Sequence, residues 1–88
     1  MPRITMYSTA WCADCRNAKR FFNEAGIVFD EIDIDQNDAA ARQVIDWSGG
    51  RRVIPTIHIQ PCEGGEPIIA HNPRMPELVR IAALVKGN

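Results

Sequence analysis

The sequence predicts an α/β fold in which four short strands form one mixed sheet flanked by helices, in the order β-α-β-α-β-β-α. Three observations predict it. Apolar residues recur at helical spacing in three segments, period-two stretches rich in β-formers lie between them, and turn-forming residues separate the elements. The 88 residues fit one domain, 1–88, and the 45% apolar and 24% charged contents are ordinary for a globular protein.

The first half of the chain predicts a strand–helix–strand unit. Residues 4–7 form a strand, and 27–34 form a second one, in which Ile32 and Ile34 alternate with Glu31, Asp33 and Asp35. Strands joined by a helix lie parallel, with a right-handed crossover. Gly26 suits the position just after the helix. The apolar face of that helix is Ala18, Phe21, Phe22 and Ala25.

A second helix is expected after Asn37 or Asp38, either of which can cap its first turn. It runs to about Trp47 with Val44 and Ile45 on its inner face, and Ser48, Gly49 and Gly50 end it.

The last part of the chain predicts a hairpin and a helix. Strands over 56–60 and 67–70 flank a turn with Gly64–Gly65. Asn72 as the N-cap and Pro73 as the first helical residue begin the final helix, which Gly87 ends. The apolar face of this helix is Leu78, Ile81, Ala82 and Val85.

Charge and cysteine content limit the function classes. The net charge is -1 and the basic clusters 19–20 and 51–52 are short, so we expect no nucleic-acid partner. The sequence shows no signal peptide and no apolar run near the roughly 20 residues of a membrane span. Three cysteines are an odd number, which argues against a secreted disulfide framework. We therefore expect a cytoplasmic protein with no membrane partner.

The segment Cys12-Ala13-Asp14-Cys15 places two thiols in the first turn of a helix. The helix dipole and its unpaired N–H groups stabilise a thiolate there, and the thiolate is the nucleophile. Cys12 comes first and is expected nearest to solvent, whereas Cys15 is shielded and has the higher pKa. We therefore expect Cys12 to attack a substrate disulfide and Cys15 to resolve the mixed disulfide.

A structural disulfide or half of a zinc site are the alternatives for this pair. Zinc needs four ligands, and the other candidates are Cys62, His58 and His71, which are distant in the sequence. The strand–loop–helix context favours redox chemistry, so we expect no metal. We expect Cys62 to be an incidental thiol, and no role is assigned to the two histidines.

Ile54-Pro55-Thr56 stands at the entrance to a strand, where a proline alone indicates an edge or a turn. The cysteine pair and the element order favour a functional role instead, because a cis proline at this place would turn the backbone of Ile54 toward the sulfur of Cys12. An extended cysteinyl substrate could then pair with that backbone like an added strand.

Residues 7–15, 32–34 and 53–56 resemble a glutaredoxin-like protein of the thioredoxin superfamily, over essentially the whole chain. Residues 33–37, 49–56 and 72–73 are most similar to the mycoredoxin branch. The resemblance implies the thioredoxin (glutaredoxin-like) fold, a cis Pro55 and a substrate cleft between Cys12 and Ile54. It also implies a thiol–disulfide oxidoreductase of electron transport and cell redox homeostasis. Such an enzyme acts on disulfide-containing proteins, binds no cofactor and takes electrons from a low-molecular-weight thiol.

The sequence departs from the usual glutaredoxin pattern at three places. Ala13-Asp14 replaces Pro-Tyr, Ser8 and Thr9 stand where a Lys is common, and 70–73 replaces a Gly-Gly segment and its downstream Asp. The donor is therefore open among glutathione, mycothiol, bacillithiol and a flavoprotein reductase. A metal or iron–sulfur carrier that uses the same cysteines is the rival class. Nothing argues against a monomer.

Four further residues are candidates around the cysteines. Asp14 disfavours the neighbouring thiolate or simply supports the helix terminus. Trp11 offers an apolar contact to a protein substrate or packs in the core. Arg51 and Arg52 hold a donor carboxylate or lie solvated in their loop.

Overall fold

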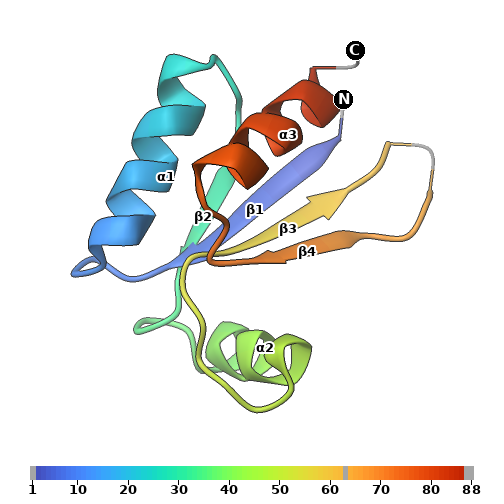
Figure 1. Cartoon of the computed structure of the whole chain (residues 1–88). Coiled ribbons are helices and arrows are strands. Elements are labelled where there is room, and N and C mark those ends of the chain that lie inside the picture. The colour runs from blue at the N-terminus through green and yellow to red at the C-terminus, as the bar shows by residue number, and fades with distance from the viewer. Residues whose placement is uncertain (1, 63, 87–88) are drawn as a thin grey trace.

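The chain forms a four-stranded sheet with three helices in the predicted order, in a computed structural model that describes residues 2–62 and 64–86 (Figure 1). The sheet order is β2-β1-β3-β4; β1 and β2 are parallel, and the other two pairs are antiparallel. The predicted mixed-sheet α/β fold is therefore confirmed. The elements are β1 (Arg3–Ser8), α1 (Ala13–Glu24), β2 (Asp30–Asp33), α2 (Asp38–Ser48), β3 (Thr56–Gln60), β4 (Ile68–His71) and α3 (Met75–Val85).

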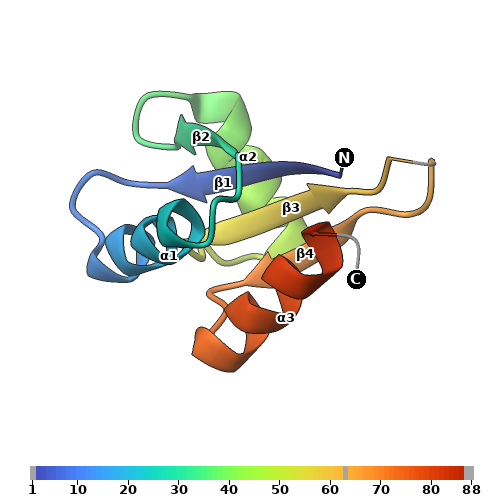
Figure 2. The same ribbon diagram turned by 90° about the horizontal axis from the view of Figure 1, so that it is seen from above.

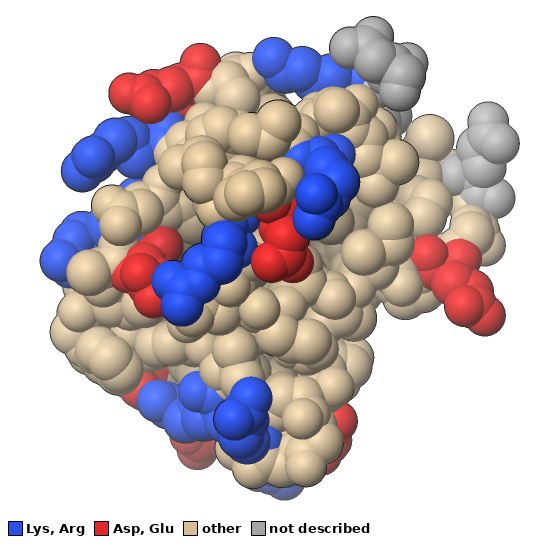
Figure 3. All heavy atoms as spheres, viewed as in Figure 1, with Lys and Arg blue, Asp and Glu red and all other residues tan. Residues whose placement is uncertain are grey.

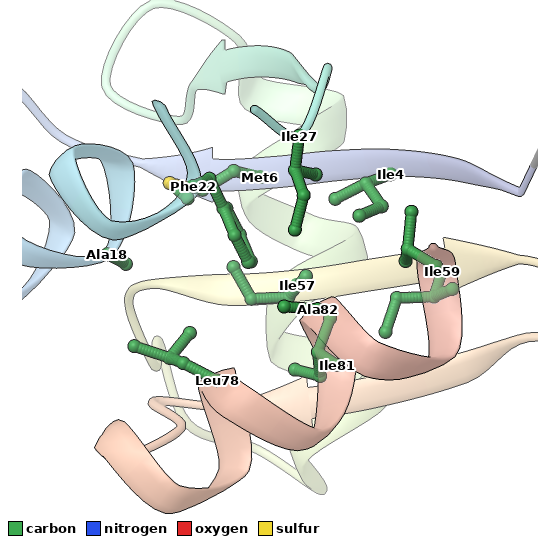
Figure 4. Packing of buried hydrophobic residues seen from close by; sticks show 11 residues of the cluster. Ile4, Met6, Ala18, Phe22, Ile27, Ile57, Ile59, Leu78, Ile81 and Ala82 are labelled. Atoms are coloured by element: carbon green, nitrogen blue, oxygen red, sulfur yellow. The ribbon is translucent and has the colours of Figure 1, made fainter. Parts of the chain in front are cut away.

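Helices cover both faces of the sheet. Helices α1 and α3 lie on one face and α2 on the other, as the two views in Figures 1 and 2 show. The larger core fills the space under α1 and α3, where the side chains labelled in Figure 4 meet. A smaller cluster of Ile34, Ala40 and Val44 lies on the α2 side. The apolar faces predicted for α1 and α3 are the faces that contact the larger core.

The second strand is shorter than the predicted 27–34, because pairing with β1 begins only where Asp30 lies opposite Thr5. The N–H of Ile27 instead donates to the carbonyl of Phe22, 2.9 Å away, and so closes the end of α1. Its side chain is buried in the larger core, and that of Val28 is 83% exposed. The predicted strand segment 27–34 is therefore divided: Ile27 anchors the loop after α1 in the core, and only residues 30–33 form β2.

The predicted start of the last helix at Asn72 and Pro73 is wrong. Asn72 has φ 45°, and its N–H donates to the carbonyl of Pro55 at 2.8 Å. Asn72 therefore lies in the connection between β4 and α3 and binds this connection to the loop before β3. Helix α3 begins at Met75 with Arg74 as N-cap. The Oε1 of Glu77 accepts a hydrogen bond from the N–H of Arg74 at 3.4 Å, which is the glutamate half of a capping box. The predicted terminator Gly87 lies outside the described residues.

The ends of α2 follow the sequence signals closely. Asn37 is the N-cap, and its Oδ1 accepts a hydrogen bond from the N–H of Ala40 at 3.0 Å. Gly49 follows the helix with φ 78°, a left-handed conformation that costs glycine little. The chain therefore turns sharply there into the loop that carries Arg51 and Arg52.

Charges on the surface are mixed in sign. Figure 3 shows Lys and Arg interspersed with Asp and Glu on the face in view, over a largely uncharged surface. Among the described residues, no helix has the length and apolar character needed to cross a membrane.

Candidate active site

Cys12 is the N-cap residue of α1, with extended backbone at φ -85° and ψ 117°. Its Sγ accepts a hydrogen bond from the N–H of Cys15 at 3.1 Å, as the side-chain oxygen of an ordinary N-cap does. The sulfur therefore lies at the positive end of the helix dipole and accepts from an N–H that has no acceptor within the helix.

The two thiols differ in burial, although both are reduced and lie in one helical turn. Cys12 is 8% exposed and Cys15 is fully buried. Burial raises the pKa of Cys15 to about 12, and its hydrogen bond to Cys12 adds to the increase. The predicted order, with Cys15 shielded and its pKa raised, agrees with this geometry.

A small polar network lies near Cys15, between α1 and β2. The Oε2 of Glu31 accepts from the Oγ of Ser8 at 2.7 Å and lies 2.9 Å from the Nζ of Lys19. Burial alone would raise the pKa of Glu31, but the hydrogen bonds from Ser8 and Lys19 outweigh it and hold this pKa below its usual value. The positive charge of Lys19 also acts to lower the pKa of Cys15.

The peptide bond between Ile54 and Pro55 is cis, as the resemblance implied. Pro55 is fully buried, and Ile54 packs against the smaller cluster under α2. Two hydrogen bonds hold this loop. The Oγ1 of Thr56 donates to the carbonyl of Val53 at 2.7 Å, and the N–H of Asn72 donates to the carbonyl of Pro55.

Trp11 and Arg52 meet at one carboxylate. The Nε1 of Trp11 donates to the Oδ2 of Asp35 at 2.9 Å, and the Nη2 of Arg52 donates to Oδ1 at 2.6 Å. The hydrogen bonds from Arg52 and Trp11 lower the pKa of Asp35. Trp11 is 65% exposed, so the alternative that it packs in the core is wrong.

Sequence reasoning missed Asp35 as a site residue, because the residue continues the polar half of an alternating strand pattern. It lies two residues past the end of β2. A usable signal was present: the carboxyl ends of parallel strands meet at one edge of a sheet, and the cysteine loop follows β1 at that edge.

The remaining candidates are placed as follows. Asp14 is exposed in the first turn of α1, and Arg51 is exposed in the loop after α2. Cys62 is exposed in the connection between β3 and β4, at the far end of β3 from Pro55. His58 stacks on Trp47 with ring centroids 5.2 Å apart, a partner that sequence reasoning did not identify. Among residues 2–62 and 64–86, no three His, Cys, Asp or Glu side chains gather as metal ligands.

The chain is similar to known glutaredoxins in sequence. The family model described as Glutaredoxin matches residues 4–61. A Mycobacterium tuberculosis protein named as a glutaredoxin is 41% identical over 54 residues, which cover 61% of this chain and 64% of that protein. The chain thus matches just under two thirds of that relative's length. Mycoredoxin 1 of Corynebacterium glutamicum is 35% identical over 57 residues, covering 65% of this chain and 70% of that protein.

Solved structures share the fold. The chain overlays on the glutaredoxin of a buckwheat glutaredoxin–glutathione complex with a TM-score of 0.69 and 26% identity, covering 97% of this chain and 74% of that one. A thioredoxin-like protein superposes with a TM-score of 0.66 at 19% identity, covering 90% and 99%, and shows the fold alone.

Proposed function

Since this chain belongs to the glutaredoxin family, we propose that it is a thiol–disulfide oxidoreductase with Cys12 as nucleophile and Cys15 as resolving thiol. One observation carries the proposal. Cys12 caps helix α1 through its sulfur, while Cys15 lies fully buried one turn further along. A dithiol mechanism requires this asymmetry, because one thiol must react first and the other must wait for the mixed disulfide.

The reaction consists of four thiol–disulfide exchanges, two with the substrate and two with the donor thiol. The Cys12 thiolate attacks one sulfur of a substrate disulfide, which forms a mixed disulfide and releases the other substrate sulfur as a thiolate that takes up a proton. Cys15 loses its proton and attacks the sulfur of Cys12, which forms the Cys12–Cys15 disulfide and releases the second substrate thiol. Two molecules of a small thiol then reduce this disulfide and become a disulfide themselves.

Burial of Cys15 supports this division of roles. A thiol with a pKa near 12 is almost entirely protonated at neutral pH, so it is a poor initial nucleophile. It becomes useful once Cys12 carries a substrate, because the two sulfurs are then held within one helical turn. The nearby charge of Lys19 favours the thiolate that must form in this step.

Substrate binding is proposed for five residues around Cys12. The backbone of Ile54 before the cis Pro55 offers strand-like pairing to an extended cysteinyl segment. Trp11 offers an exposed apolar ring beside the nucleophile. Arg51 and Arg52 offer guanidinium donors for a carboxylate, since Arg52 has N–H groups beyond the one that Asp35 accepts.

The proposed electron donor is a low-molecular-weight thiol. Support comes from the mycoredoxin and glutaredoxin relatives and from the similar buckwheat protein, which was solved with glutathione. Glutathione, mycothiol and bacillithiol are the candidates, and a flavoprotein reductase is the alternative donor. We propose that the protein works as a cytoplasmic monomer on disulfide-containing proteins.

The proposal is tested by a coupled assay in which each donor in turn supports reduction of one mixed-disulfide substrate. Wild type, Cys12→Ser and Cys15→Ser are compared, and Cys62→Ser is the matched control because its thiol lies away from the site. We expect activity with one donor, loss of activity in Cys12→Ser, and wild-type activity in Cys62→Ser. Full activity in Cys12→Ser, or none for wild type with any donor, would contradict the proposal.

Asp14 is proposed to tune the reduction potential. Its carboxylate follows Cys12 by two residues and destabilises the thiolate of the reduced protein, which makes the protein more reducing. Asp14→Ala should therefore shift the potential by roughly 5–20 mV toward more oxidising values. Asp38→Ala removes a first-turn acid from α2 instead and is the control. An unchanged potential in Asp14→Ala would leave only the helix-terminus role.

A further inference from the structure

Three loops near Cys12 are joined through a single side chain. Trp11 belongs to the loop between β1 and α1, Asp35 to the loop between β2 and α2, and Arg52 to the loop between α2 and β3. Each carboxylate oxygen of Asp35 accepts one hydrogen bond, 2.9 Å from the indole nitrogen and 2.6 Å from the guanidinium nitrogen.

We propose that Asp35 is a positioning residue that fixes the indole of Trp11 beside Cys12 and ties it to the cis-proline loop, for the binding of protein disulfides. The inference rests on the proposed function and names the feature that favours a protein substrate over a small disulfide. Asp35 acts through Trp11 and Arg52 and does not itself touch the reacting sulfurs.

The backbone of Asp35 is itself held in place, which a positioning residue requires. Its N–H donates to the Oδ1 of Asp33 at 2.9 Å, and the N–H of Gln36 donates to the carbonyl of Asp33 at 3.0 Å. The preceding residue, Ile34, is 1% exposed and donates its N–H to Ser8 at 2.9 Å. The carboxylate therefore projects from a turn that is anchored to the end of β1.

The loop of Arg52 is anchored in a similar way. The N–H of Arg51 donates to the Oγ of Ser48, the last residue of α2, at 2.8 Å. Two residues after Arg52, Ile54 packs into the smaller core cluster. The ion pair with Asp35 thus joins two loops that are each fixed to a different part of the fold.

The exposure of Trp11 is the reason why holding its indole in one orientation would help a protein substrate to bind. An indole that is 65% exposed and otherwise free would sample several rotamers, and a partner would have to order it on binding. The hydrogen bond to Asp35 satisfies the one polar group of the ring and leaves its apolar surface free for a polypeptide. A small disulfide that reaches only Cys12 gains nothing from this surface.

Steady-state kinetics test the inference. We compare wild type, Asp35→Ala, Asp35→Asn and Asp46→Ala with the disulfides of insulin and with bis(2-hydroxyethyl) disulfide. In Asp35→Ala, KM for insulin should rise roughly threefold to tenfold, as for the loss of one ordinary hydrogen bond, with kcat unchanged. KM for the small disulfide should stay the same. Asp35→Asn retains an acceptor oxygen for Trp11 and should recover much of the loss, and Asp46→Ala removes another exposed acid as the control.

A spectroscopic readout tests the same contact without any activity. The chain has two tryptophans, so Trp47→Phe leaves Trp11 as the single tryptophan, which can be excited selectively at wavelengths that tyrosine does not absorb. In that background, Asp35→Ala should lower the anisotropy of Trp11 emission and increase its quenching by acrylamide, whereas Asp46→Ala should change neither. Trp11→Phe keeps a ring but removes the N–H, and in the otherwise native chain it should reproduce the rise in KM for insulin.

The two proposals fail in different ways. If the wild-type protein has no disulfide reductase activity, the proposed function is overturned. The fluorescence experiment does not depend on activity, so unchanged Trp11 anisotropy in Asp35→Ala would overturn the positioning role in that case too. An active wild type with equal KM changes for insulin and the small disulfide, or with no change for either, also overturns the positioning role. If Asp35→Ala fails to fold, Asp35→Asn and Trp11→Phe decide the matter by the same comparison.

Discussion

Cys12 and Cys15 have different chemistry because one lies at the end of a helix and the other inside its first turn. Cys12 accepts a helix N–H on its sulfur, and Cys15 is fully buried. Burial disfavours the thiolate of Cys15 and raises the pKa of this thiol. This difference supports the proposed division of roles, in which Cys12 is the nucleophile and Cys15 the resolving thiol.

The raised pKa of Cys15 predicts a loss of stability at high pH. The folded state keeps this proton up to a pKa of about 12, whereas the unfolded chain releases it near 9.0. Above pH 9 the unfolded state therefore binds fewer protons, and the free energy of unfolding falls until about pH 12. Urea unfolding of the reduced protein between pH 8 and about 11 should show a steeper decline for wild type than for Cys15→Ala. Parallel declines would contradict the raised pKa, and the exposed Cys62, as Cys62→Ala, provides the control.

At the scale of elements, the connection from β4 to α3 shows how tertiary contacts override a local signal. Asn-Pro is a common helix start, yet Asn72 adopts φ 45° and donates its N–H to Pro55. The left-handed region is accessible to Asn at lower cost than to most residues. The contact links the cis-proline loop to the start of α3, so the helix begins three residues later, at Met75.

Substitutions at Asn72 should report this backbone conformation. Asn72→Ala should lower the free energy of unfolding by about 1 kcal/mol, because a Cβ without a compensating polar group disfavours positive φ. Asn72→Gly should be close to neutral, since glycine adopts this conformation freely. Urea denaturation of the three proteins measures both differences. An alanine variant as stable as the glycine variant would show that the conformation carries no cost.

For the whole molecule, the sheet is covered by helices on both faces, so the buried apolar contacts that stabilise the fold form two clusters. The larger core lies under α1 and α3, and the smaller one lies under α2, beside Ile54 (Figures 1 and 4). A domain of this size has only about 5–15 kcal/mol of net stability, so single core positions matter. The cysteine loop and the cis-proline loop connect elements on opposite faces, α1 and α2, to the strands between them.

Ile57 tests this distribution. It is fully buried in β3, and Ile57→Ala should cost about 2–5 kcal/mol through lost burial and the cavity left behind. Val79 on α3 is 51% exposed, and Val79→Ala should cost less than about 1 kcal/mol. Thermal and urea unfolding compare the two variants with wild type. Similar losses for both would contradict the assignment of Ile57 to the core.

The sequence by itself determined the parts of this protein that depend on neighbours in the chain. Helical periodicity placed the apolar faces of α1 and α3, and the two candidates Asn37 and Asp38 placed the cap of α2 to within one residue. Cys12 and Cys15 followed from one short motif at a strand–helix junction. These features were predictable because a helix face, a cap and an N-terminal thiolate are set within a few residues.

Only the tertiary structure decided the features that join distant segments. Asp35 has Trp11 and Arg52 as partners because the ends of β1 and β2 lie together, and β2 is short because Ile27 closes α1 instead of pairing. Asn72 lies outside the helix predicted to begin there, and its N–H donates to the carbonyl of Pro55. Such contacts form where the sheet brings two chain segments within hydrogen-bond distance. The separation of two residues in the sequence does not give that distance.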